Sequence, residues 1–130
     1  MQKPPRDAAS RREALAVGAR MEALVEASLH ATGWTIRARN WSGGGGELDV
    51  IAERKGGFAE AEIRFVEVKA RDLEDPLSDE AISSSKRTRL RRAARLWMEQ
   101  EGWDGPAAFL VAVVDTGDES VRWIDDAFDG

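Results

Sequence analysis

The sequence predicts an α/β fold built on a mixed sheet of about five strands flanked by helices. Two observations predict this fold class. Apolar residues recur with helical spacing in two long segments, whereas five shorter segments show the alternating or continuous apolar residues typical of strands. These segments follow the order helix, three strands, helix, two strands. With 130 residues, 42% of them hydrophobic and 33% charged, the chain is expected to form one domain with one modest core.

Three elements and a turn follow a polar N-terminal segment in the first half of the chain. Residues 1–11 contain two prolines and several charges and are expected to form a disordered tail. Apolar residues at roughly helical spacing predict an amphipathic helix over residues 12–31. Alternation predicts a strand over residues 34–41, and four consecutive glycines at 43–46 predict a loop or tight turn. Residues 47–53 predict the second strand.

The second half supplies a further strand, a helix and a final pair of strands. Residues 63–70 are rich in β-branched side chains and predict the third strand. Residues 84–101 place their apolar side chains on one side and predict the second helix. The continuous apolar run at 107–114 predicts a buried strand, and residues 120–124 predict the last one. Residues 12–130 are therefore expected to form a single domain.

The residue types present exclude several kinds of site. The chain has no cysteine and a single histidine, His30, which excludes a disulfide framework, a thiolate zinc site, a cysteine nucleophile and a multi-histidine metal site. Any divalent cation must therefore use oxygen ligands, which suits magnesium, manganese or calcium. No stretch approaches the ~18 apolar residues of a membrane span, and the polar N-terminus lacks a secretory apolar segment. We therefore expect no membrane partner and a cytoplasmic location.

Positive charge is concentrated in the second predicted helix. The net charge of −5 and the pI near 5.0 argue against nucleic-acid binding on average, but local potential decides where a polyanion docks. Cations without intervening acids repel one another along a helix unless phosphate groups offset the cost; the alternative is a solvated basic face. The candidate nucleic-acid contacts in this helix are Lys86, Arg87, Arg89, Arg91, Arg92 and Arg95.

Two residues just before the glycine run join this set of candidate contacts. Trp41 adjoins the glycines and is a candidate for stacking on a base, and Arg39 precedes it by two positions. The alternative for Trp41 is packing in the core or at its rim, which is the commoner role of a tryptophan.

Charged side chains lie inside two predicted strands, where apolar ones are expected. Because side chains alternate along a strand, Glu67 and Lys69 point to the same face of the sheet. Asp49 lies among apolar residues of the preceding strand. Buried charges are costly unless they are paired or bind a metal. Two neighbouring strands that each offer an acid to one face would form an oxygen site for a divalent cation, with Lys69 beside it. The alternative is a structural ion pair on an edge strand.

The order of these motifs resembles a known family. The motifs are Gly18 with Glu22, residues 46–52 (Gly-Glu-Leu-Asp-Val-Ile-Ala), residues 65–71 (Phe-Val-Glu-Val-Lys-Ala-Arg) and the closing Ile124 with Phe128. They resemble the YraN family, also called UPF0102, which belongs to the PD-(D/E)xK nucleases of the restriction-endonuclease-like fold and is similar to archaeal Holliday-junction resolvases. The resemblance covers roughly residues 14–128.

This resemblance implies a restriction-endonuclease-like core and a metal-dependent endonuclease that hydrolyses DNA phosphodiester bonds, branched or junction DNA included. It implies Mg²⁺ or Mn²⁺ as cofactor and a homodimer as the assembly. Asp49 and Glu67 would be metal ligands, with the backbone carbonyl of Val68 as a third. Lys69 would be the catalytic lysine, able to contact a phosphate or orient the attacking water. Glu22, from the first helix, would complete the catalytic acidic cluster.

Two further residues take supporting roles. Glu47 shares a face with Asp49 by strand alternation and would support the ligands from behind. Lys86 matches the family's lysine at the start of the second helix and would meet the phosphate backbone. The chain departs from the family where the family usually carries Arg-Phe-Asp, because residues 108–110 are Ala-Phe-Leu.

Two other functions remain open at this point. The same fold would serve as a non-catalytic module that binds nucleic acid or a partner through residues 86–95, with the acidic cluster kept for stability. RNA is the other substrate to consider, because no RNA-reading motif is required for it.

Overall fold

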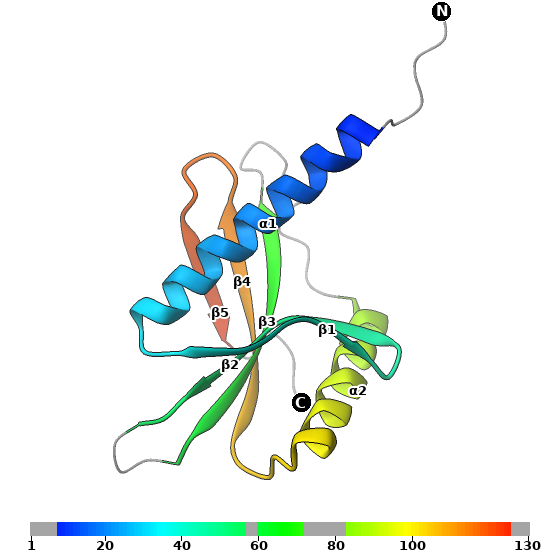
Figure 1. Ribbon diagram of the computed structural model, residues 1–130, viewed down its shortest axis with the longest axis vertical. Helices are drawn as coiled ribbons and strands as arrows, with labels where there is room; N and C mark the ends of the chain where they lie inside the picture. The colour runs from blue at the N-terminus through cyan, green and yellow to red at the C-terminus, as the bar shows by residue number, and fades with distance from the viewer. Residues whose placement is uncertain (1–7, 57–59, 72–82, 126–130) are drawn as a thin grey trace, which may run out of the picture.

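The computed structural model describes residues 8–56, 60–71 and 83–125 (Figure 1). The elements follow the order helix, three strands, helix, two strands, which confirms the predicted α/β class with a mixed five-stranded sheet and two helices. No helix among these residues is both long enough and apolar enough to span a bilayer. The elements are α1 (Ala8–Ala31), β1 (Thr35–Gly43), β2 (Gly46–Arg54), β3 (Glu62–Arg71), α2 (Ser84–Glu101), β4 (Ala107–Asp115) and β5 (Val121–Asp125).

Helix α1 begins earlier than predicted. It starts at Ala8, so residues 8–11, which were expected to belong to the tail, are helical. Ala8 and Ala9 have high helix propensity and follow the two prolines, so they extend the helix toward the N-terminus. Residues 1–7 lie outside the described residues.

The sheet has the strand order β1-β2-β3-β4-β5. Strands β3 and β4 are parallel, and the other three neighbouring pairs are antiparallel. A parallel pair needs a long crossover connection, which contains α2. Helix α1 contacts all five strands, whereas α2 contacts mainly β1 and β2. In Figure 1, α1 crosses the sheet and α2 lies beneath the far end of the β1–β2 hairpin.

The core has two parts, one on each face of the sheet, here called the α1 face and the α2 face. On the α1 face, Val25 of α1 and Val66 of β3 are at most 1% exposed. On the α2 face, Phe65 of β3 meets Trp97 of α2 edge to face, with ring centroids 5.8 Å apart. Strand alternation separates neighbours such as Phe65 and Val66 between the two parts.

The glycine run forms the tight turn that was predicted. Gly44 and Gly45, with φ of 61° and 84°, connect β1 to β2 in a two-residue hairpin, the geometry that requires positive φ at both positions. Gly46 has a different role. A Cβ atom there would collide with the backbone carbonyl of Arg89 on α2. The tip of the hairpin therefore packs directly on the α2 backbone.

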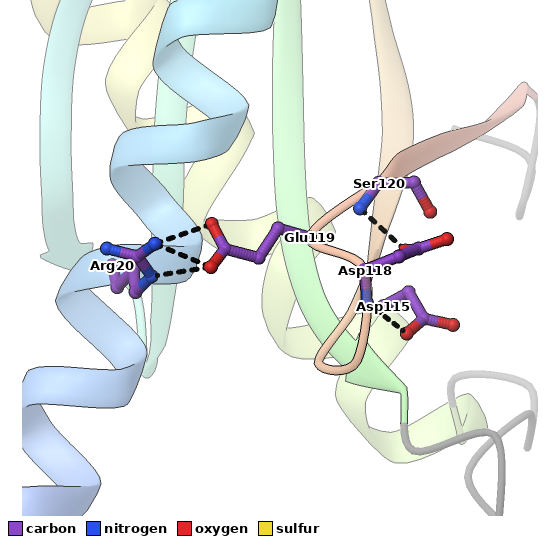
Figure 2. Close-up of polar contacts among 5 residues, drawn as sticks. All are labelled: Arg20, Asp115, Asp118, Glu119 and Ser120. Carbon is purple, nitrogen blue, oxygen red and sulfur yellow. Dashed lines mark hydrogen bonds and ion pairs between the residues drawn. The ribbon is translucent and has the colours of Figure 1, made fainter.

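An ion pair joins the turn between β4 and β5 to α1 (Figure 2). Arg20 of α1 donates to both carboxylate oxygens of Glu119, at 2.5 and 2.7 Å. Within the turn, the buried carboxylate of Asp115 accepts the backbone N–H groups of Gly117 and Asp118 through one oxygen, at 2.7 and 3.2 Å. The turn thus has its own hydrogen bonds as well as the link to α1.

Candidate functional site

A cavity of about 590 Å³ lies between the glycine hairpin, strands β2 and β3, and the first turns of α2. We call it the Glu67 cavity. One wall carries carboxylates, the opposite wall carries cations of α2, and the hairpin closes the end. Its lining residues are Ser42, Gly43, Gly45, Gly46, Glu47, Asp49, Glu67, Lys86, Arg89 and Leu90.

Asp49 and Glu67 reach this cavity from neighbouring strands. Backbone pairing of β2 with β3 ends at Val50 and Val66, one residue before Asp49 and Glu67 would face each other. Beyond that point a side chain replaces the backbone as the link between the two strands. The Oδ2 atom of Asp49 accepts the backbone N–H of Val68 at 2.8 Å. This bond holds Asp49 against β3, close to Glu67, as the two-strand argument from the sequence predicted.

Glu67 is a buried acid with a nearby acid and a nearby base. Its side chain is 10% exposed, and its Oε1 atom lies 2.5 Å from Nζ of Lys86. Burial, and after it the charge of Asp49, raises the pKa of Glu67 from its usual 4.5 to about 7, while Lys86 opposes the increase. One ammonium group therefore compensates only part of the negative charge that the two carboxylates bring together.

Glu22 and Glu47 add negative charge near Asp49. The amide of Asn40 donates to Glu22 at 3.4 Å, which orients Glu22 from β1. Partial burial raises the pKa of Glu22 and the Asn40 bond lowers it, while the charges of Asp49, Glu26 and Glu47 raise it further. Glu22 therefore lies within electrostatic reach of Asp49, and Glu47 lines the Glu67 cavity with Asp49.

Lys69 is half-buried on β3, two residues beyond Glu67 and on the same face of the sheet. It does not line the Glu67 cavity as that cavity is formed here. The predicted Glu-x-Lys pair thus shares a face, and Glu67 takes Lys86 as a partner.

The predicted nucleic-acid contacts fall into two groups. Lys86 and Arg89 line the Glu67 cavity, and Arg92 and Arg95 are exposed on α2. Arg87 and Arg91 are partly buried on the same helix. The sheet side of α2 is apolar and is formed by Leu90, Ala93, Ala94 and Trp97.

The other group, from β1, engages protein atoms. Arg39 pairs with Glu26 of α1 at 2.7 Å. Trp41 packs against the core of the α2 face. This packing agrees with the alternative stated for Trp41 in the sequence, and stacking of its partly buried ring on a base stays a prediction.

Oxygen ligands for a divalent cation are present but few. Among residues 8–56, 60–71 and 83–125, no three acidic or histidine side chains converge as a ready-made cage. The predicted set needs only two carboxylates, Asp49 and Glu67, with the backbone carbonyl of Val68. Magnesium commonly binds through one or two carboxylates and keeps several waters. The incompletely compensated charge on Glu67 also favours a cation, so the residues fit magnesium or manganese.

Sequence reasoning missed two features of the site. One is Asn40, which has a φ of 47° and donates its amide N–H to Glu22; asparagine is one of the few residues besides glycine that readily adopt such a positive φ. The other is the ion pair between Lys86 and Glu67. No sequence signal could find it, because the sequence predicts the bounds of α2 but not how the helix lies against the sheet.

Comparison with known proteins places this site in a family. Residues 21–116 match the profile of the family described as "Uncharacterised protein family UPF0102". A UPF0102 protein of Nitratidesulfovibrio vulgaris is 42% identical over 118 residues, which cover 88% of this chain and 84% of the relative. One of Methylobacterium radiotolerans is 37% identical over 113 residues, covering 87% and 83%.

A third relative is longer. A UPF0102 protein of Oleidesulfovibrio alaskensis is 42% identical over 106 residues, covering 78% of this chain and 49% of the relative, so the chain spans about half of that protein's length. The matched region of the family profile contains Glu22, Asp49, Glu67, Lys69 and Lys86. The chain belongs to the UPF0102 family.

Proposed function

We propose that this protein is a metal-dependent endonuclease that hydrolyses phosphodiester bonds in DNA, branched or junction DNA included. The observation that carries the proposal is the pairing of Asp49 with Glu67 in a cavity whose opposite wall is cationic. A site that cleaves a phosphodiester needs oxygen ligands for a cation and positive groups for the phosphate. The Glu67 cavity offers both within one space.

The residues that would hold Mg²⁺ or Mn²⁺ are Asp49 and Glu67, with the backbone carbonyl of Val68. When bound, the metal would neutralise charge on the phosphate oxygens and lower the pKa of a coordinated water. The bond from Val68 N–H to Asp49 Oδ2 leaves the other oxygen of that carboxylate for this purpose. Glu22 and Glu47 add negative potential from behind.

The basic residues would position the substrate. Arg89 lines the cavity opposite the carboxylates and would contact the phosphate backbone. Lys86, whose side chain is 45% exposed beside Glu67, would contact an oxygen of the phosphate backbone. Lys69, on the same face of β3, would orient the attacking water.

The reaction is a hydrolysis. The oxygen of water bonds to phosphorus in line with the 3′-oxygen, the bond from phosphorus to the 3′-oxygen breaks, and the leaving oxygen takes up a proton. One water is consumed for each bond cut. The products are a 5′-phosphate and a 3′-hydroxyl.

Labelled DNA substrates test the proposal directly. Single-stranded, duplex, flap and four-way-junction DNA would be incubated with the protein and with Mg²⁺, Mn²⁺ or EDTA. We expect cutting with either metal and none in EDTA. Glu67→Gln and Lys69→Ala should each reduce the rate by at least about 100-fold, the loss typical of a metal ligand or a proton-handling group.

A matched variant controls for indirect effects. Glu53→Gln removes a carboxylate from β2 that pairs with Arg37 at 2.6 Å, outside the Glu67 cavity, and should cut normally. Circular dichroism would confirm that each variant is folded. Cutting by Glu67→Gln at the wild-type rate would refute the proposed role of the cavity.

A second function is favoured by one specific contact. Lys86 already neutralises Glu67 in part, as in a site kept for stability, so the chain would serve as a non-catalytic module that binds nucleic acid or a partner. Salt-sensitive DNA binding through residues 86–95 without cutting in any metal would support it. Labelled RNA in the same panel tests the other substrate.

The same proposal implies an assembly and a location. Two copies would bring two sites to one branched DNA, which sedimentation with and without junction DNA would detect as a homodimer. The cytoplasm would be the place of action, because chromosomal DNA and Mg²⁺ are both present there in bacterial relatives.

A further inference from the structure

A second cavity, of about 250 Å³, lies on the α1 face of the sheet, away from the Glu67 cavity. We call it the Arg64 pocket. It opens beneath the C-terminal end of α1 and combines apolar walls with two guanidinium groups. Its lining residues are Leu29, Thr32, Trp34, Arg54, Arg64, Leu110 and Trp123.

The charge in this pocket is unbalanced. Glu62 is the carboxylate that pairs with both arginines, with Arg54 at 2.8 Å and with Arg64 at a longer 3.9 Å. Among the described residues, two guanidinium groups therefore share one carboxylate. The walls around them are tryptophan, leucine and threonine side chains, none of which is charged. The lining residues thus bring two positive charges close to an apolar surface.

Arg64 also has an unsatisfied donor. Its Nε atom is buried and has no hydrogen-bond partner among the described residues. A buried donor without a partner is costly, and in native proteins it commonly marks a bound water or ion. The Arg64 side chain as a whole is 24% exposed, and it lines the pocket.

The arginines are held in place by an aromatic ring. The guanidinium of Arg54 lies over the ring of Trp34 at 4.6 Å from its centroid, and that of Arg64 lies at 5.7 Å. Trp34 is 7% exposed and lies three residues after the end of α1. Stacking on a fixed ring orients both guanidinium groups in advance and lowers the entropy cost of binding an anion.

We propose that the Arg64 pocket binds a small organic anion, a flat apolar group that carries a phosphate or a carboxylate. The oxyanion would accept from Arg64 and Arg54, and the apolar part would lie against Trp123 and Leu110. The volume of about 250 Å³ suits a ligand no larger than a mononucleotide.

This site is independent of the proposed nuclease activity. Arg64 and Glu67 are three residues apart on β3 and therefore point to opposite faces of the sheet. Binding to the Arg64 pocket requires no divalent cation. A measurement in EDTA thus tests the pocket alone, whether or not the protein cleaves DNA.

Calorimetric titration of the full chain in EDTA is the test. Adenosine monophosphate and benzoate represent the phosphate and carboxylate sources, adenosine and benzamide are their neutral counterparts, and inorganic phosphate lacks the apolar part. We expect at least one organic anion to bind with a Kd of about 1 mM or tighter. Its neutral counterpart and inorganic phosphate should each bind at least about tenfold more weakly.

Two variants assign the binding to the pocket. Arg64→Met keeps the aliphatic stem and should weaken binding by about tenfold or more, and Arg54→Met, at a more exposed position, should do the same if the first variant does not fold. Arg37→Met is the matched control, since Arg37 also lies on a strand, stacks on a tryptophan and pairs with a glutamate, but on the α2 side.

The outcomes separate cleanly. Binding of an organic anion that the pocket variants weaken and Arg37→Met leaves unchanged would establish the site. No binding of either anion at about 10 mM, or binding that the pocket variants do not change, would overturn it. The two guanidinium groups would then serve only to balance the carbonyl end of α1.

Discussion

Val66 and Glu67 are neighbours on β3 and point to opposite faces of the sheet. Both are buried, at 1% and 9% exposure. Val66 is surrounded by apolar side chains of the α1 face, whereas Glu67 meets Asp49 and Lys86 at the end of the α2 face. The same degree of burial therefore has opposite energetic consequences one residue apart.

The difference shows how this small sheet divides its tasks. Beyond Arg64, the α1 face is apolar along β3 and β4, from Val66 and Leu110 to Ala112 and Val114. The α2 face begins equally apolar at Ile63 and Phe65 and then changes to charge. The apolar stretches of both faces contribute stability, so the end of the α2 face can hold carboxylates that lower stability and create a site.

A charge placed on the α1 face should have the largest effect. Val66→Asp would bury a carboxylate among the apolar side chains of the α1 face, and we expect it to lower the free energy of unfolding by about 4 kcal/mol or more. Urea denaturation measures this loss. Val17→Asp makes the same substitution at a position 48% exposed and should change stability by about 1 kcal/mol at most. Similar losses in both variants would contradict the comparison.

The contact between the hairpin and α2 should be the next most sensitive feature. Gly46→Ala would force a Cβ atom into the Arg89 carbonyl, and overpacking of this kind costs about 1–3 kcal/mol. Moving α2 away would also separate Lys86 from Glu67. Gly18→Ala is the control, because a Cβ there meets nothing within 4 Å and should stabilise α1 by up to about 1 kcal/mol. Thermal unfolding of both variants would show opposite shifts.

Removing the buried charge of Glu67 should stabilise the protein in EDTA. The pKa of about 7 lies above the usual 4.5, so the folded chain keeps a proton that the unfolded chain has released. Stability therefore falls as pH rises from about 4.5 through 7. At pH 8, the free energy of unfolding of Glu67→Gln should be about 1–2 kcal/mol higher than that of the wild type.

The pH dependence sharpens this prediction. At pH 4 the carboxyl group is protonated in both states, so the advantage of Glu67→Gln should vanish. Melting curves at both pH values, in EDTA, provide the measurement. A variant less stable than the wild type at pH 8 would mean that the ion pair with Lys86 outweighs the cost of burial and of Asp49.

The sequence was sufficient for the fold class and for the pairing of Asp49 with Glu67. Apolar periodicity located all seven elements, and α2 has the predicted bounds, because Ser83 accepts the N–H of Lys86 at its start and Gly102 ends it in the left-handed region. Two acids on the same face of adjacent strands necessarily lie close together, because the spacing between strands is fixed.

Features that depend on packing between distant segments were not predictable in this way. The start of α1 at Ala8 depends on helix propensity that prolines nearby obscured. Trp41 is amphipathic, and only the position of α2 decides that it packs in the core. The Arg64 pocket requires the end of α1, β2, β3 and β5 to meet, and no local pattern encodes that meeting.

The smallest effect is expected from the contact between Arg20 and Glu119 in Figure 2, although both carboxylate oxygens of Glu119 accept from Arg20. Arg20 binds Glu119 through three hydrogen bonds, yet their side chains are 62% and 38% exposed. Water and salt screen such a pair, so Arg20→Ala should cost about 0.5 kcal/mol or less. Asp115→Ala should cost more, because the Asp115 carboxylate is buried and satisfies two backbone N–H groups. Urea unfolding of the two variants at low and high salt measures both losses. If Arg20→Ala costs more than Asp115→Ala, hydrogen-bond geometry predicts stability better than burial does in this molecule.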